Sequence, residues 1–378
     1  MWVCLAKIEG TYDKDEMKIN ERMKLKFNWK KIKLKYVVFC VVLVFLLDFF
    51  GAFTHFFELD YHTKFVYPLD IDIQDVLFKL KNGMQPDIKP INEYNYRFKI
   101  KNENKCKIKD GKFHEVRLLY VIKSALRNVL QRNAIRNSWG WEKRFSDVTI
   151  KRVFILGIDP NDPLLQDKID EEFNKHNDII QADFIDTYYN NTIKTMLSFK
   201  WVVHYCPRAQ YIFFSDDDMY VSTKNVLAFI RNPLNIQLGE RRRLLYEHDI
   251  YNGKLLAGYV FFSPPMRHKI SKWYISLKEY PYSKYPPYVT AGAYLVSYPA
   301  LLDLYYTSLY TKNFRFDDIY LGILARKAEI DPLHNKNFYF WKKDYTKDSY
   351  ASVIASHGYG DPDELLKVWN EQRSLGHA

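Results

Sequence analysis

Three adjacent aspartates, Asp216, Asp217 and Asp218, directly follow an apolar, aromatic run in the segment YIFFSDDDMYVS (residues 211 to 222). Neighbouring carboxylates repel one another, and beside a buried strand they are stable only where water or a cation offsets their charge. A solvated turn at a strand end would supply water. A divalent cation held by carboxylates and phosphate oxygens would supply positive charge. In an extended segment Asp216 and Asp218 project to one side and Asp217 to the other.

Strand and helix patterns alternate around this acidic triplet. An α/β fold with a mainly parallel central sheet is therefore predicted, and ligands of such sheets bind beyond the carboxyl ends of the strands, where the triplet lies. Strands are expected at residues 116–125, 151–159, 178–184 and 211–216, and helices at 128–140, 164–176 and 190–206.

Charge and composition limit the possible partners. The chain has 378 residues, 47% of them hydrophobic, and a formal net charge of +11. Residues 1–35 hold ten Lys or Arg against five Asp or Glu, and the remaining basic residues are interspersed with acidic ones. We expect no nucleic-acid partner, because the chain lacks a long basic stripe, whereas a mildly positive domain suits a small anionic substrate.

The N-terminal region predicts a membrane anchor. Residues 1–35 form a basic tail, 36–57 a largely apolar segment, and 58–110 a polar, proline-containing stem, followed by a domain at 111–378. The apolar segment is long enough to span a bilayer if Asp48 lies near an interface. A cleaved signal peptide is the alternative, but no small-residue cleavage site follows. Positive charge retained in the cytoplasm would place the domain in the secretory lumen.

The cysteines and one sequon fit that placement. Cys4 would lie in the cytoplasm and Cys40 in the membrane, so Cys106 and Cys206 are the remaining luminal pair and are expected to join in an oxidising compartment. Asn190, in Asn190-Asn191-Thr192, is a glycosylation acceptor if it is exposed.

An ordered series of motifs resembles the β-1,3-glycosyltransferase family of galactosyltransferases and N-acetylglucosaminyltransferases, which are type II Golgi membrane proteins. The resemblance covers about two-thirds of the chain, from Leu118 to Trp369. It is carried by RNAIRNSWG (132–140), FILG (154–157), DFIDTYYNNTIKT (183–195), SFKWVVHYC (198–206), DDD (216–218), YPPYVTAGAYLVS (285–297) and FDDIYLG (316–322).

The resemblance implies a GT-A type nucleotide-sugar fold, a UDP-sugar donor and Mn²⁺. By the family pattern, Asp218 and His357 would ligate the metal. The donor would contact Asp216 and Asp217, together with three residues assigned to the UDP pocket: Ser124, Arg132 and Arg136. Arginine suits phosphate because its planar fork pairs with two oxygens. Without the family, the i, i+4 spacing of the arginines would indicate an exposed helix face.

The family also implies inversion at the anomeric carbon, which needs a base to take the acceptor hydroxyl proton. We place that base at Asp318, with Asp317 orienting the site, although the sequence alone does not separate the two. An acidic helix start favoured by the macrodipole would explain the pair equally well. The acceptor and sugar groove is assigned to Trp273, Tyr285, Tyr288 and Tyr294, since flat rings suit the apolar faces of sugars.

Two departures from the family are Phe214-Ser215, where a lysine often precedes the triplet, and Asp317 in place of a glutamate. Neither removes a proposed ligand or base. The expected activity is transfer of galactose from UDP-galactose to a glycan on lipid or protein in the Golgi, with UDP-N-acetylglucosamine as the alternative donor. A silent, lectin-like member would lack the acidic groups, and a phosphotransferase would need a glycine-rich phosphate loop, which is absent from the sequence.

Overall fold

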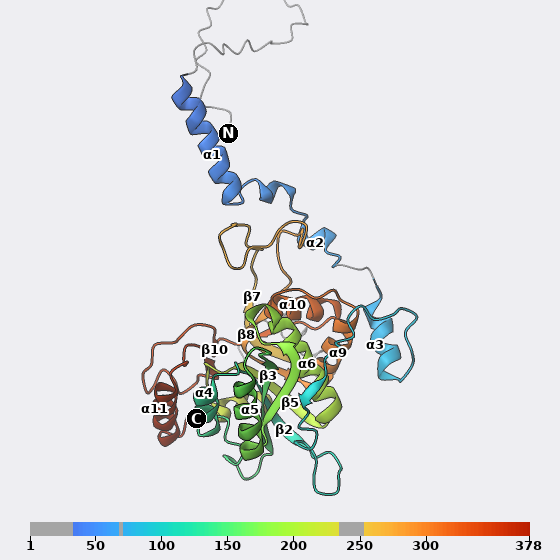
Figure 1. Ribbon diagram of the computed structural model, residues 1–378, viewed down its shortest axis with the longest axis vertical. Helices are drawn as coiled ribbons and strands as arrows, with labels where there is room; N and C mark the ends of the chain where they lie inside the picture. Colours follow the sequence, from blue (N-terminus) through green and yellow to red (C-terminus); the bar gives the residue numbers. More distant parts are fainter. Residues whose placement is uncertain (1–32, 68–70, 234–252) are drawn as a thin grey trace, which may run out of the picture.

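The computed structural model describes residues 33–67, 71–233 and 253–378 (Figure 1). An N-terminal helix projects from an α/β domain whose sheets are flanked by helices. The basic tail therefore lies almost entirely outside the described residues. The helices are α1 (Leu34–Phe49), η2 (Thr54–Phe57), α2 (Tyr61–Lys64), α3 (Ile73–Lys81), α4 (Val129–Arg136), α5 (Pro163–His176), η3 (Tyr188–Asn190), α6 (Asn191–Tyr205), α7 (Thr223–Arg231), α9 (Tyr298–Leu309), α10 (Asp317–Lys327) and α11 (Pro362–Ser374).

A mixed, eight-stranded sheet forms the centre of the domain, in the order β1-β4-β3-β2-β5-β8-β7-β9. The α/β prediction is confirmed. The four strands from β4 to β5 are parallel, whereas β1 and β8 add to them antiparallel, so the sheet is less uniformly parallel than predicted. The strands are β1 (Phe98–Ile100), β2 (Val116–Lys123), β3 (Ile150–Ile158), β4 (Ile179–Ile185), β5 (Ala209–Asp216), β7 (Leu256–Phe261), β8 (Tyr288–Ser297) and β9 (Leu333–His334), and a small sheet pairs β10 (Phe338–Tyr339), β11 (Ala355–Ser356) and β6 (Tyr220–Val221).

The central strands are buried on both faces, which explains their nearly continuous apolar sequences. Alternate residues of β2 enter different cores: Leu119 and Val121 pack with α6, α9 and α10, whereas Leu118 and Tyr120 pack with α4, α7 and α11. The register sets Lys123, the last residue of β2, opposite Asp216, the last residue of β5. Strands β2 and β5 therefore each place a charged side chain at the same edge of the sheet.

The predicted stem is partly incorporated into the domain. Val76 and Leu77 of α3 are buried in the core that includes α9, and β1 pairs with β4. The expected boundary between stem and domain, at residue 110, is therefore too late. The apolar residues of this polar stretch are scattered in the sequence, and their packing partners lie far along the chain. Cys106 and Cys206, the pair expected from the sequence, are joined in the structure with Cα atoms 5.3 Å apart.

Helix α1 covers the first part of the apolar segment at 36–57, and the chain then turns into η2. No helix in the described part of the chain combines the length and hydropathy required to cross a membrane.

Gly322 lets helix α10 pack directly on β8. A Cβ at this position would lie 2.6 Å from Tyr288 Cβ and 2.9 Å from the Pro287 carbonyl oxygen. Gly322→Ala gains about 0.5–1 kcal/mol of helix propensity, but we expect the overpacking to cost about 1–3 kcal/mol and to lower the thermal midpoint. Gly360→Ala is the matched control, because its Cβ would meet nothing closer than 3.9 Å. An unchanged or higher midpoint for Gly322→Ala would contradict the close packing.

Candidate active site

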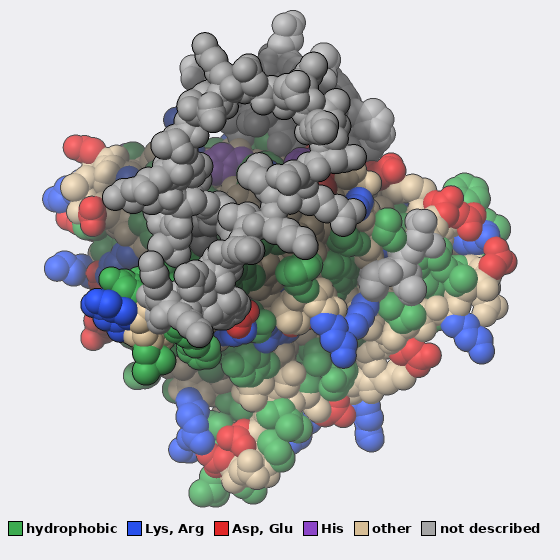
Figure 2. Space-filling model, turned by 90° about the horizontal axis from the view of Figure 1, so that it is seen from above, with side chains coloured by type: hydrophobic (Ala, Val, Ile, Leu, Met, Phe, Trp, Pro, Cys, Tyr) green, Lys and Arg blue, Asp and Glu red, His purple; other side chains and the backbone are tan. Residues whose placement is uncertain are grey.

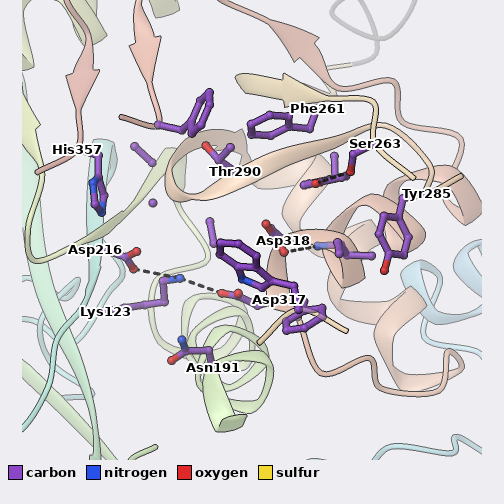
Figure 3. Close-up of a pocket in the computed structure, with 18 of the residues that line it drawn as sticks. Lys123, Asn191, Asp216, Phe261, Ser263, Tyr285, Thr290, Asp317, Asp318 and His357 are labelled. Carbon is purple, nitrogen blue, oxygen red and sulfur yellow. Dashed lines mark hydrogen bonds and ion pairs between the residues drawn. The ribbon is translucent and has the colours of Figure 1, made fainter. Parts of the chain in front are cut away.

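Lys123 is the centre of the site. Its Nζ lies 3.1 Å from Asp216 Oδ1 and 2.8 Å from Asp317 Oδ2, so it bridges the end of β5 and the start of α10 (Figure 3). The Lys123 side chain is only 6% exposed. Burial would lower the pKa of Lys123, but the two carboxylates outweigh that effect and raise it above its usual value. The lysine is therefore a fixed positive charge between two acidic groups.

The acidic pair has two different environments. Asp317 accepts hydrogen bonds from Lys123 Nζ and from Thr195 Oγ1 at 3.0 Å. Burial opposes ionisation of Asp317, but Lys123 dominates and lowers its pKa. Asp318 accepts a hydrogen bond from the Ile319 backbone N–H at 2.8 Å. Burial and then the charge of Asp317 raise the pKa of Asp318 to about 7. Asp317 is thus held as an anion, whereas Asp318 can exchange a proton near neutral pH.

Asp218 and His357 face each other, with Asp218 Oδ2 3.0 Å from His357 Nε2. The Tyr359 backbone N–H donates to the Asp218 carbonyl at 2.7 Å, which fixes the two segments side by side. Asp218 Oδ1 is buried and has no hydrogen-bond partner within the described protein. The described residues include no cluster of three or more metal-binding side chains. A carboxylate oxygen in need of a partner beside an imidazole fits a cation that takes its other ligands from a diphosphate and water.

Strand β5 ends at Asp216, and Asp217 and Asp218 lie in the turn that follows rather than in an extended segment. Asp217 Oδ2 accepts from Asn128 Nδ2 at 3.0 Å. Burial raises the pKa of Asp217, and hydrogen bonds from Ser124 and Asn128 partly oppose that shift. Each aspartate of the triplet therefore has its own partner, which relieves the mutual repulsion of the three charges. Ser124 lies beside the triplet, and its assignment to a UDP pocket stays a prediction.

A cavity of about 680 Å³ lies beside these groups. Lys123, Asp216, Asp317, Asp318 and His357 all line it (Figure 3). Three of the four aromatic residues assigned to the groove also contribute to its wall: Trp273, Tyr285 and Tyr288.

Tyr294 does not line the cavity, contrary to its assignment. It is 2% exposed, and its ring stacks on Phe214 with centroids 4.9 Å apart. On β8 its side chain points into the core rather than toward the cavity, because successive strand residues face opposite sides of a sheet. With many tyrosines in the core, residue type alone did not separate the two positions.

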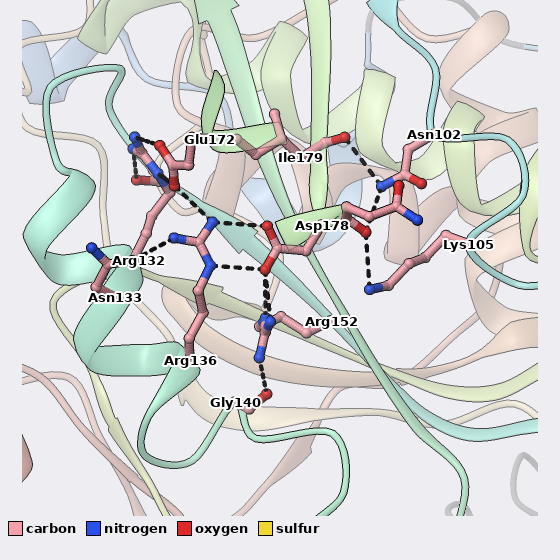
Figure 4. A network of polar contacts seen from close by, with 12 residues as sticks. Asn102, Lys105, Arg132, Asn133, Arg136, Gly140, Arg152, Glu172, Asp178 and Ile179 are labelled. Carbon is pink, nitrogen blue, oxygen red and sulfur yellow. Dashed lines mark hydrogen bonds and ion pairs between the residues drawn. The ribbon is translucent and has the colours of Figure 1, made fainter. Parts of the chain in front are cut away.

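Arg132 and Arg136 lie outside the cavity, in a buried ion-pair network (Figure 4). Arg132 is fully buried and pairs with both Glu172 oxygens, at 2.8 and 2.7 Å. Its remaining N–H groups donate to Ser124 Oγ and to the carbonyls of Ala125 and Leu126, so all five donors are used. Arg136 pairs with Asp178, which also binds Arg152.

These contacts correct both readings of the arginine pair. Neither residue lies on an exposed helix face, and Arg132 has no free donor for a phosphate. Instead, Arg132 holds the backbone of residues 124–126, the loop that leads to Asn128 and its contact with Asp217. The i, i+4 spacing correctly set the two side chains on one face of α4, and only the tertiary structure turned that face inward.

Comparison with known proteins identifies the family. The galactosyltransferase family model matches residues 130–336. Beta-1,3-galactosyltransferase brn of Drosophila melanogaster is 42% identical over 337 residues, which cover 89% of this chain and 95% of that protein. The chain belongs to the galactosyltransferase family.

Other members are similar over much of their length. Beta-1,3-galactosyltransferase 1 of Homo sapiens is 34% identical over 289 residues, 76% of this chain and 82% of that protein. The solved galactosyltransferase LgtC, in complex with donor and acceptor sugar analogs, matches 68% of this chain and 94% of its own chain at 13% identity, with a TM-score of 0.32. The resemblance deduced from the motifs to the β-1,3-glycosyltransferases is confirmed.

Sequence analysis of this family member missed three polar residues of the site. Lys123 and Thr195 bind Asp317, and Lys194 is buried between Asp186, at 2.7 Å, and the Ser124 carbonyl, at 2.8 Å. A lysine that ends an otherwise apolar parallel strand was the available signal for Lys123. Asn190 lies beside the cavity-lining Asn191, and its side-chain amide donates to the Ile185 carbonyl, so glycosylation there stays a prediction.

Arg132→Lys should distinguish support of this loop from direct contact with a nucleotide. Lysine keeps the charge but cannot serve Glu172 and the three loop acceptors together, so we expect the free energy of unfolding to fall by about 1–3 kcal/mol. Arg208→Lys is the control, since Arg208 pairs with Glu115 on the surface and such pairs contribute little. Denaturant unfolding without nucleotide measures both. Equal stability of the two variants would favour a ligand-binding role for Arg132.

Proposed function

We propose that this protein is an inverting β-1,3-glycosyltransferase that moves galactose from UDP-galactose to a hydroxyl of a glycan on lipid or protein. The observation that carries the proposal is that Asp216, the first residue of the acidic triplet, lines one cavity with the acidic pair Asp317 and Asp318, and that Lys123 joins Asp216 to Asp317. Family membership supports sugar transfer, and the relatives named above are β-1,3-galactosyltransferases. A GT-A type nucleotide-sugar fold is part of the proposal.

In this mechanism Asp318 is the base. The acceptor oxygen bonds to the anomeric carbon while the bond from that carbon to the diphosphate breaks, and Asp318 takes the hydroxyl proton. Asp317 is the weaker base, because Lys123 and Thr195 donate to its Oδ2 and its pKa is lowered. Attack from the face opposite the diphosphate inverts the anomeric configuration. The product is therefore a β-linkage from an α-linked donor.

The donor side of the cavity must bind a charged leaving group. Asp218 and His357 would hold Mn²⁺, whose charge would offset that of the departing UDP. Asp216, fixed by Lys123, would face the ribose, and Ser124 and Asp217 would line the nucleotide pocket on the loop that Arg132 supports. Trp273, Tyr285 and Tyr288 would bind the apolar faces of the sugars.

We also propose that residues 36–57 attach the enzyme to the Golgi membrane, with the catalytic domain in the lumen. Supporting observations are the exposed apolar side chains of α1, none of which is buried, and the basic residues that precede them in the sequence. The joined Cys106 and Cys206 suit an oxidising lumen.

The donor and the metal are tested together. The full chain is incubated with Mn²⁺ and either UDP-galactose or UDP-N-acetylglucosamine over a panel of glycan acceptors, and the products are weighed by mass spectrometry. We expect a gain of one hexose that a chelator abolishes. A gain of one N-acetylhexosamine would instead assign the alternative donor, and no transfer with any pair would favour a silent, sugar-binding member.

Asp218→Ala and Asp318→Ala should lose activity for different reasons. Each is expected to reduce transfer by roughly 100-fold or more, since each removes a group that acts on the reacting atoms. Only Asp218→Ala should also weaken metal-dependent UDP binding, measured by calorimetry. Unchanged UDP affinity in Asp218→Ala would rule out the metal assignment.

The pH profile tests the role of Lys123. Because Asp318 must be deprotonated to accept a proton and its pKa is about 7, kcat/KM should rise as the pH increases through that value. Lys123→Met removes a charge that favours ionisation of the pair, so this acidic limb should move to higher pH, with a rate loss of roughly tenfold or more. Thr195→Val, which removes one neutral hydrogen bond to Asp317, should move it less. An unshifted limb in Lys123→Met would argue against Asp318 as the titrating base.

A further inference from the structure

The segment 262–274, which follows β7, borders two features at once. Pro264, Met266 and Trp273 line the catalytic cavity. Its other side contacts the chain that leaves helix α1. The end of the apolar helix and the wall of the cavity therefore meet in one contact region, called the joint below, between residues 48–58 and residues 262–274.

The joint is closely built. Lys269 Nζ lies 2.8 Å from Asp48 Oδ2. Arg267, 2% exposed, bonds Glu58 Oε1 at 2.7 Å and donates to the carbonyls of Ile275, Tyr280 and Tyr282. Gly51 has φ +79°, and a Cβ there would lie 2.5 Å from the Arg267 carbonyl oxygen. A buried ion pair and a glycine that permits close approach indicate a fixed attachment rather than a loose tether.

Large apolar side chains surround this joint and face solvent. Phe56 is 82% exposed, Phe57 73% and Ile270 66%, and Phe50 stacks on His268 with ring centroids 4.8 Å apart. Lys272 Nζ lies 4.5 Å from the centre of the Trp273 ring, which is itself half-exposed. Figure 2, seen from the end where α1 lies, shows apolar, basic and acidic side chains interspersed on the exposed surface.

Single exposed apolar residues are ordinary, but a group of them that continues from an apolar helix indicates a binding surface. Helix α1 has apolar side chains all round and buries none of them against the domain. Aromatic rings together with lysines suit the headgroup level of a bilayer, where each side chain keeps one end in an apolar layer and the other in water.

We propose that Phe56, Phe57 and Ile270 form a platform that lies on the bilayer surface beside α1 and holds the catalytic cavity next to the membrane. This inference rests on the membrane attachment proposed above and adds a peripheral contact in which Ile270 of the domain lies beside Phe56 and Phe57 at the end of the attachment segment. The platform restricts how the domain is oriented, because its residues and the cavity wall share one segment. A second copy of the chain is the competing occupant.

The test uses the full chain in phosphatidylcholine vesicles. Cys4→Ser and Cys40→Ser remove the two cysteines other than the joined Cys106 and Cys206, and an environment-sensitive NBD probe is attached at Ile270→Cys or Phe57→Cys. The matched control is Leu164→Cys, because Leu164 is 72% exposed on α5, which Figure 1 places away from α1. Quenching by lipids with a nitroxide at the fifth acyl carbon reports contact within about 10 Å of the headgroup boundary.

Severalfold stronger quenching at residues 270 and 57 than at 164 would support the platform. Flotation of the same vesicles separates the possible failures. A chain that does not float refutes membrane attachment and the platform together. A chain that floats but is quenched equally at 270 and 164 refutes the platform alone. A probe signal at 270 that depends on protein concentration in detergent, without lipid quenching, would assign the surface to a second copy. Sugar transfer assayed in detergent is independent of all these outcomes.

Discussion

The ion pairs of Lys123 with Asp216 and Asp317 are the interaction on which the rest of the site depends. They join the end of β5 to the start of α10. Asp317 lies 194 positions after Lys123 in the sequence. A buried ammonium is costly unless its donors are paired, and two carboxylates here provide the pairing. The same contact lowers the pKa of Asp317, whereas burial and the charge of Asp317 raise the pKa of Asp318 to about 7. The positive charge of Lys123 therefore supports both the connection of β5 to α10 and the proposed proton transfer.

The acidic triplet is stable because its members do not share an environment. Asp216 faces Lys123, Asp217 faces Asn128, and Asp218 faces His357. Asp216 ends strand β5, and the turn at Asp217 and Asp218 separates the three directions. Among the described residues, Asp218 Oδ1 is buried without a hydrogen-bond partner, and this oxygen is the feature that fits a cation. The fold therefore offsets most of the repulsion among the three carboxylates.

Support for the site extends well behind the cavity. Arg132, Glu172, Arg136, Asp178 and Arg152 form a continuous buried network from α4 through α5 to β3 (Figure 4). Breaking such a network leaves an unpaired charge in the interior, so its members act together. The network ends at the carbonyls of Ala125 and Leu126, to which Arg132 donates. Arginine is typical of phosphate binding, but here it fixes the backbone of the loop at residues 124–126.

The sequence by itself determined the alternating strands and helices between residues 116 and 216, the acidic triplet at the carboxyl end of a strand, and the family, because apolar periodicity and local motifs are properties of neighbouring residues. It could not assign Tyr294 to the core, Arg132 to a buried pair, or α3 and β1 to the domain, because each depends on partners far along the chain. Lys123 was missed for the same reason: its role exists only once the β2–β5 register sets it opposite Asp216 and helix α10 brings Asp317 to within hydrogen-bonding distance. Only the tertiary structure decided which charges meet.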